Sequence, residues 1–167
     1  MRLRDLFAAG LSTLCLGVAA QLSTPDPDWK ELETPAPPAF ELSRLVPFDV
    51  SINSTLKFGV DPATITIGQD GVVRYVIVAR SGSGTVNAMY EGLRCSTGEM
   101  RTYARYNASG GWARTTDSEW RSVFANAATR HTLMFAKQGG CTDNAPPRSV
   151  NDIVRSLRNQ DLEKRAS

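Results

Sequence analysis

Short apolar segments separated by turn residues dominate the chain between Phe40 and about Thr116. Their lengths are typical of strands rather than helices. The clearest hairpin signal is Asp70-Gly71, which lies between two β-branched runs. Serine- and glycine-rich turns follow later, so successive hairpins predict an antiparallel meander. We expect strands at 45–48, 55–60, 64–67, 72–79, 86–94 and 100–106.

The last third of the chain has helical rather than alternating periodicity. We expect a short helix from Ser118 to Asn126 and a terminal helix from Ser149 to Leu162. Ser149 is a good N-cap, and Asp152 follows at the capping-box position. The predicted fold class is therefore α+β, an antiparallel β-meander sheet with short flanking helices and a C-terminal helix. The short helix would bury Trp120, Val123 and Phe124, and the apolar face of the terminal helix would be Val150, Ile153, Val154 and Leu157.

The first twenty residues have the layout of a secretory signal peptide. Arg2 and Arg4 precede an uncharged run that ends in small residues at Ala20, where we expect cleavage. The run is shorter than the roughly 20 apolar residues that span a bilayer, so we expect no integral membrane span in the mature form. A lipoprotein signal is the alternative because of Cys15, but Leu14 fits a lipid-attachment motif badly. We therefore expect a periplasmic protein without a lipid anchor.

Composition divides the remaining chain into three parts. Residues 21–39 contain five prolines and predict an extended arm. Trp29 is out of character for a free linker, and we expect it to pack back onto the domain. Residues 40–160 would form a single α+β domain, followed by a polar tail at 161–167.

Charge and cysteine content exclude several functional classes. The chain has 167 residues, with 19 basic and 17 acidic side chains, and a net charge of +2 is too small for a general nucleic-acid binder. Without the leader, Cys95 and Cys141 are the two remaining cysteines, and in an exported chain they predict a disulfide. Such a crosslink stabilises a fold by about 4 kcal/mol in the chain-entropy model.

No motif in the sequence indicates a specific reaction. His131 is the one histidine, and no His, Cys and carboxylate cluster has metal-ligand spacing, so we expect no metal and no cofactor. We interpret His131 as a surface or hydrogen-bonded polar residue rather than a catalytic base. Nucleophile-elbow and phosphate-loop motifs are absent too. We expect a protein that is not an enzyme; the alternative is a periplasmic hydrolase using carboxylates such as Glu91 or Asp117.

One compositional bias points to binding. Eight arginines and no lysine lie between Val72 and His131, together with all four tyrosines. Guanidinium groups bind carboxylates and phosphates and stack on aromatic rings, so this interval predicts an anion- or partner-binding face. The alternative is an ordinary sheet surface covered by long amphipathic side chains. Alternation also places Arg74 and Tyr75 on opposite faces. The candidate binding residues are Arg74, Tyr75, Tyr90, Arg94, Tyr103, Arg105 and Trp112.

Several short motifs resemble a known family. The most specific is the element from Tyr90 to Cys95, Tyr-Glu-Gly-Leu-Arg-Cys, and others are Asp28-Trp29-Lys30-Glu31 and Gly111-Trp112. Together they resemble the cryptic neisserial protein-like family, exported envelope proteins of Gram-negative bacteria without an assigned activity and often lipoproteins. The resemblance implies an exported protein of the cell envelope. The signal peptide, the absence of a catalytic motif and the arginine- and tyrosine-rich interval together favour a non-catalytic binding or interaction module. Its partner would be an envelope protein or an anionic envelope polymer.

A second resemblance is local. Residues 70–81 are similar to the start of the TonB carboxy-terminal domain, which pairs its strands with a peptide of an outer-membrane partner. This likeness makes a strand-pairing module a second alternative. It covers one hairpin, a pattern that arises in unrelated sheets.

Overall fold

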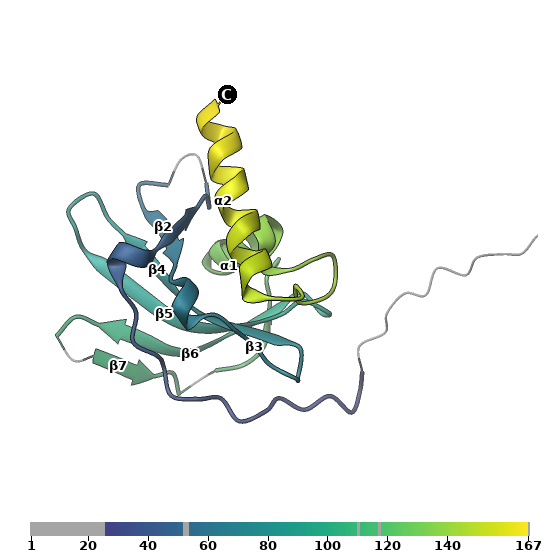
Figure 1. The fold of residues 1–167 in the computed structure, drawn as a ribbon. Coiled ribbons are helices and arrows are strands. Elements are labelled where there is room, and N and C mark those ends of the chain that lie inside the picture. The colour runs from purple at the N-terminus through teal and green to yellow at the C-terminus, as the bar shows by residue number, and fades with distance from the viewer. Residues whose placement is uncertain (1–25, 52–53, 110, 117, 167) are drawn as a thin grey trace, which may run out of the picture.

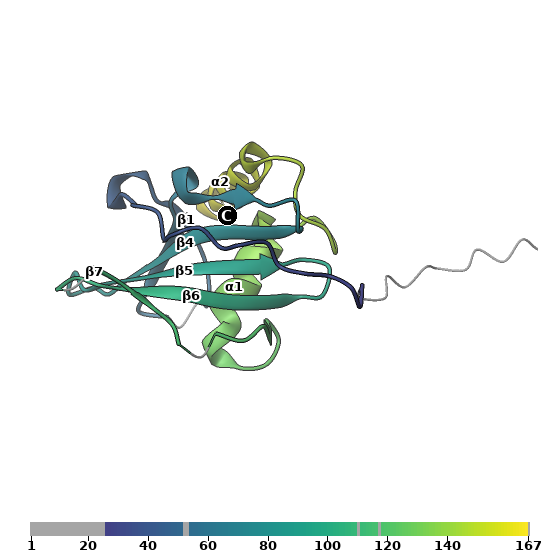
Figure 2. The same ribbon diagram turned by 90° about the horizontal axis from the view of Figure 1, so that it is seen from below.

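The computed structural model describes residues 26–51, 54–109, 111–116 and 118–166. The expected leader with Cys15, and also Asp117, lie outside the described residues. A twisted antiparallel sheet forms the middle layer, with two helices on one face and the N-terminal arm running across the other (Figures 1 and 2). The predicted α+β class with a C-terminal helix is confirmed.

Eight strands form the sheet in the part of the chain that is described. The long strands β4 (Val72–Arg80), β5 (Val86–Arg94) and β6 (Glu99–Asn107) are sequential hairpin neighbours, as the meander prediction requires. They are extended by β7 (Gly111–Arg114) on one side and by β2 (Lys57–Val60) and β1 (Val46–Phe48) on the other. Two short strands, β3 (Thr66–Ile67) and β8 (Arg121–Ser122), pair with β4 and β6.

Glycine allows the tight turns before β4 and between β5 and β6. Gly71 has a φ of 76° at the predicted hairpin between β3 and β4, and Gly98 has a φ of 64° between β5 and β6. Both values lie in the left-handed region, where a Cβ atom is disfavoured.

Strand β4 is flanked on both sides. It pairs with β2 and β3 along one edge and with β5 along the other. Its backbone groups are therefore used within the sheet, so the 70–81 segment that resembles the TonB domain has no free strand edge along β4.

The terminal helix α2 (Val150–Ala166) begins where its sequence predicts. The Ser149 hydroxyl accepts a hydrogen bond of 3.2 Å from the Asp152 amide, which completes the expected N-cap. Ile153 and Leu157 are fully buried against the sheet. The helix continues four residues past Leu162, because Glu, Lys, Arg and Ala follow and all favour helix.

The predicted helix from Ser118 to Asn126 is wrong. This segment contains strand β8, which pairs with β6, and the following Phe124 is exposed rather than buried. Tertiary hydrogen bonds hold the chain extended: the Ser118 hydroxyl donates to the Thr102 carbonyl at 2.7 Å. Helical structure begins later, with a 3-10 turn at Ala127–Thr129, helix α1 (Arg130–Phe135) and a π-helical segment at Ala136–Gly140.

Two apolar clusters lie on the two faces of the sheet. The larger packs Tyr75, Ile77 and Leu93 against Phe135 of α1 and Ile153 of α2. The smaller lies under the arm and consists of Val76, Val78, Ala88, Tyr90 and Ala104, with Phe40 and Leu45 packed against it.

The predicted disulfide between Cys95 and Cys141 is confirmed, with 5.7 Å between the Cα atoms. It ties the end of β5 to the segment between α1 and α2. Among the residues described, no helix is long and apolar enough to cross a membrane.

Candidate functional site

The sheet distributes the arginine and tyrosine candidates over both of its faces. Arg74, Tyr90 and Tyr103 lie on the face crossed by the arm, whereas Tyr75 packs on Phe135 on the helical face. Arg105 also faces the helical side, beside Met89. A β-bulge between Tyr90 and Glu91 shifts the register of β5 against β6. The predicted candidates therefore do not make one continuous binding surface.

Four basic and aromatic groups of the described residues contact one carboxylate on the arm face, that of Glu31. Its oxygens accept hydrogen bonds from the Tyr103 hydroxyl at 2.6 Å, Arg101 Nη1 at 2.7 Å and the Trp120 indole at 3.1 Å. Arg74 lies 3.4 Å away. Burial alone would raise the pKa of Glu31, but the hydrogen bonds from Tyr103 and Trp120 and the charge of Arg101 outweigh it and lower the pKa.

Trp29 forms the second attachment of the arm. Its indole N–H donates to the Asp70 carbonyl at 2.8 Å, and the Arg94 guanidinium lies 3.8 Å from the centre of its ring. Trp120 meets the same indole edge-on. The expectation that Trp29 packs back onto the domain is confirmed.

Asp70 completes this network. Its carboxylate pairs with Arg74 at 2.6 Å and accepts from the Leu32 amide at 3.0 Å. The anion that the arginine-rich strands were expected to bind on this face is thus supplied by the chain's own Glu31 and Asp70. Trp112 lies further along the same face, edge-on to Phe40 at 5.9 Å.

A second polar cluster is buried on the helical face around Glu91. This fully buried carboxylate contacts His131 Nε2 at 2.9 Å and accepts from the Thr132 hydroxyl at 3.0 Å. The hydroxyls of Tyr75 and Thr102 contribute at 3.3 and 3.5 Å. Each carboxylate oxygen therefore already has two donors, which satisfies a buried charge.

His131 is the polar, hydrogen-bonded residue that its sequence context predicts, but it is buried rather than at the surface. Its ring stacks parallel to Phe58 at 6.1 Å. Desolvation lowers the pKa of His131, but the adjacent charge and hydrogen bond of Glu91 outweigh it and raise the pKa, against a smaller opposing effect of Arg105.

Above this pair lies a cleft of about 410 Å³, lined by the sheet, by Thr115 and by residues between Ser118 and His131. Glu91 and His131 contribute to its lining, and Arg105, Glu119 and Arg121 are further charged groups around it. Arg105 Nη1 contacts the Met89 sulfur at 3.0 Å, and sulfur is a weak acceptor. The rest of the lining is mixed, with hydroxyls from Thr102, Thr115 and Ser118 and apolar side chains from Leu56, Phe58 and Met100.

The chemistry of this cleft favours holding an anion over abstracting a proton. Glu91 has no exposed surface and its lone pairs are engaged, so it is poorly placed to meet a substrate. Arg105 offers donors at the cleft wall. No cluster of three His, Cys, Asp or Glu side chains in the described segments could hold a metal ion.

The sequence profile of the CNP1-like family matches residues 24–158. The chain belongs to the CNP1-like family. The match spans the docked arm, the whole sheet and the first half of α2. Searches of curated proteins and of solved structures found no significant match.

The Tyr90–Cys95 element, the most specific motif of the sequence, has a structural role at nearly every position. Tyr90 packs on Tyr103 under the arm, and Glu91 binds His131 on the opposite face. Gly92 leaves room for the Tyr103 hydroxyl, which would collide with any Cβ atom at this position. Arg94 stacks on Trp29, and Cys95 forms the disulfide.

Sequence reasoning missed the two carboxylates that organise the arm face, Glu31 and Asp70. A local signal existed for Asp70, because Arg74 follows four residues later across a tight turn. The signal for Glu31 was weaker. It lies two residues after Trp29, the residue that is unusual for a free linker. Thr132 and its contact with Glu91 had none, because helix α1 was not predicted.

Proposed function

We propose that this CNP1-like protein is an exported, periplasmic envelope module that binds an acidic polymer of the cell envelope without transforming it. The signal-peptide layout of the first twenty residues supports export. The internal roles of the Tyr90–Cys95 element support a non-catalytic function, because its charged residues are engaged in holding the fold.

The observation that carries the proposal is the placement of Arg105. The arm neutralises Arg74 and Arg101, whereas Arg105 is exposed at the cleft and contacts a thioether. A guanidinium at the wall of a partly apolar cleft is a natural partner for a carboxylate. Hydroxyls of Thr102, Thr115 and Ser118 line the same cleft and suit the hydroxyls of a sugar. An acidic glycan combines both chemistries.

Titration calorimetry with oligogalacturonate, a carboxylate-bearing glycan, tests this function. Arg105→Gln should weaken binding at least about tenfold, since a charge-assisted hydrogen bond contributes about 1.5–3 kcal/mol. Arg80→Gln is the matched control, because Arg80 is an exposed arginine at the end of β4 outside the cleft lining, and it should bind as the unaltered protein does.

Two further probes separate the competing explanations. A neutral oligosaccharide of the same length should not bind, and an acidic peptide such as oligoglutamate should bind more weakly than the glycan. Binding that is equal in Arg105→Gln and the unaltered protein, or preference for the peptide, would contradict the proposal.

The hydrolase alternative has its own readout. The same oligogalacturonate, incubated with the protein, should show no new reducing ends. Product formation that disappears in Glu91→Gln or His131→Gln would replace the binding function with a catalytic one.

A further inference from the structure

Phe124 is the most exposed large apolar side chain of the described residues, with 69% of its surface accessible. It follows β8 and packs one edge of its ring over Gly98 in the β5–β6 turn. An isolated exposed leucine needs no explanation, but an aromatic ring that forms the wall of an apolar hollow marks an interaction surface.

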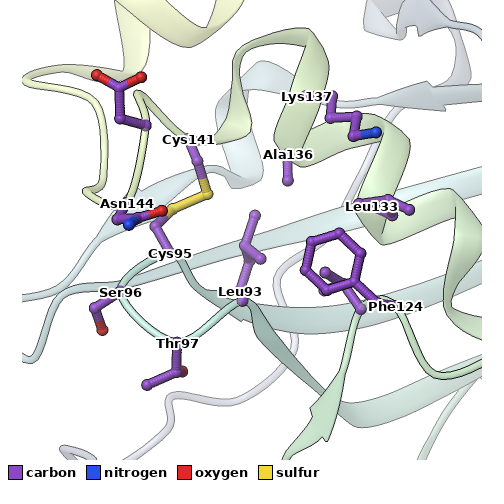
Figure 3. Close-up of a pocket in the computed structure, with 13 residues that line it drawn as sticks. Leu93, Cys95, Ser96, Thr97, Phe124, Leu133, Ala136, Lys137, Cys141 and Asn144 are labelled. Atoms are coloured by element: carbon purple, nitrogen blue, oxygen red, sulfur yellow. A yellow bond between two sulfur atoms is a disulfide. The ribbon is translucent and has the colours of Figure 1, made fainter. Parts of the chain in front are cut away.

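The hollow beside Phe124 is a pocket of about 480 Å³ (Figure 3). Leu93, Val123, Leu133 and Ala136 line it, and the Cys95–Cys141 disulfide forms the side opposite Phe124. It shares no lining residue with the cleft at Arg105. The pocket therefore needs an explanation other than the proposed glycan site.

We propose that this surface binds a second copy of the same chain around a two-fold axis, with the Phe124 ring of each copy in the pocket of the other. A two-fold interface joins the same patch on both subunits, so that patch must carry both the projecting group and its receptor. Phe124 and the pocket lie side by side and meet this requirement.

The charges at the rim fit the same arrangement. Lys137 and Asp143 both line the pocket and come from different segments, one before and one after the disulfide at Cys141. With an axis through the mouth of the pocket, Lys137 of one copy approaches Asp143 of the other, and each pair occurs twice. The net charge of the chain is only +2, so two copies repel each other weakly.

Sedimentation velocity of the purified protein across a range of concentrations tests the proposal. The unaltered protein should show a monomer–dimer equilibrium, and Phe124→Ser should weaken it at least about a hundredfold because two rings lose their pockets. Leu162→Ser is the matched control: Leu162 is 62% exposed near the end of α2, away from the pocket lining, and its replacement should leave the equilibrium unchanged.

A charge variant distinguishes this two-fold dimer from nonspecific hydrophobic association. Lys137→Glu should weaken the dimer about tenfold by facing Asp143 of the second copy, and adding Asp143→Asn should recover part of the loss. Asparagine is the right replacement because Asp143 has a φ of 54°, which asparagine tolerates. A protein that stays monomeric at several hundred micromolar, or a dimer insensitive to Phe124→Ser, would overturn the proposal, whatever the outcome of the glycan titration.

Discussion

The guanidinium of Arg94 lies flat enough over Trp29 to approach its ring centre to 3.8 Å, and the next residue, Cys95, is bonded to Cys141. Two segments remote in sequence are thus fastened at consecutive positions at the end of β5. One is the arm on one face of the sheet, and the other is the connection between the helices on the opposite face.

Replacing Glu31 should release the arm. Glu31→Gln removes the charge that Arg101 and the buried Arg74 face, and we expect the free energy of unfolding to fall by about 2–3 kcal/mol. Trp29 should become more exposed, which shifts tryptophan fluorescence to longer wavelength. Urea unfolding followed by that fluorescence measures both effects. Glu33→Gln, two residues away and exposed in the same arm, should change neither, and an equal effect of the two variants would contradict the role of Glu31.

A side chain at position 92 should displace Tyr103. Gly92→Ala places its Cβ against the Tyr103 hydroxyl, which is held by Glu31, so we expect a loss of roughly 1–3 kcal/mol from overpacking. In a Tyr103→Phe background the hydroxyl is absent and the same substitution should cost less. Thermal unfolding of the four proteins of this double-mutant cycle gives the coupling energy, and a coupling near zero would show that the close approach is unimportant.

Reducing the disulfide should lower the free energy of unfolding, but the sheet should remain folded. The crosslink closes a loop of sequence separation 46, which corresponds to about 4 kcal/mol in the chain-entropy model. Chemical denaturation with and without a phosphine reductant, and of the Cys95→Ser, Cys141→Ser double variant, measures the difference. If the free energy of unfolding falls by less than about 1 kcal/mol, the prediction is contradicted. The reduced unfolded chain would then keep residual structure that restricts it as the disulfide does.

The Glu91–His131 pair should make the free energy of unfolding decrease as the pH rises above about 6.5. Glu91 raises the pKa of His131 in the folded protein above its ordinary value near 6.5, so folding favours the protonated ring. This contribution is fully present below the unfolded pKa and is lost as pH rises through the higher folded pKa. His131→Gln should flatten the decline between those two values.

The pKa of His131 can be followed directly by NMR titration of its ring protons. Arg105→Gln should raise this pKa further, because Arg105 opposes protonation. A pKa at or below 6.5 in the unaltered protein would contradict the arrangement.

Periodicity was sufficient to predict the long strands and the terminal helix. β5 runs from Val86 to Arg94, as expected, because turns with serine and glycine bound this apolar segment at both ends. Helix α1 escaped detection because it is only six residues long and continues into a π-helical segment with two glycines. The segment at 118–126 had helical apolar spacing, but hydrogen bonds to β6 and to the arm determined its conformation.

The composition of the arginine-rich interval gave no sign that the chain's own Glu31 and Asp70 would face these arginines. Glu31 meets Arg74 across 43 residues and Trp120 across 89. A local sequence pattern cannot indicate a contact between residues that lie so far apart in the chain. The burial of Glu91 could not be predicted either. The sequence of a strand does not show whether a single glutamate in it faces water or a histidine.

The large sequence separation between Glu31 and its hydrogen-bond donors also implies an order of folding. Its donors, Arg74, Arg101, Tyr103 and Trp120, converge only once β4, β5, β6 and the segment leading to β8 are aligned. Hairpins of short sequence separation form faster than such distant contacts. The arm should therefore dock last, after the sheet has formed. Its residues are nevertheless the first of the described chain to be synthesised.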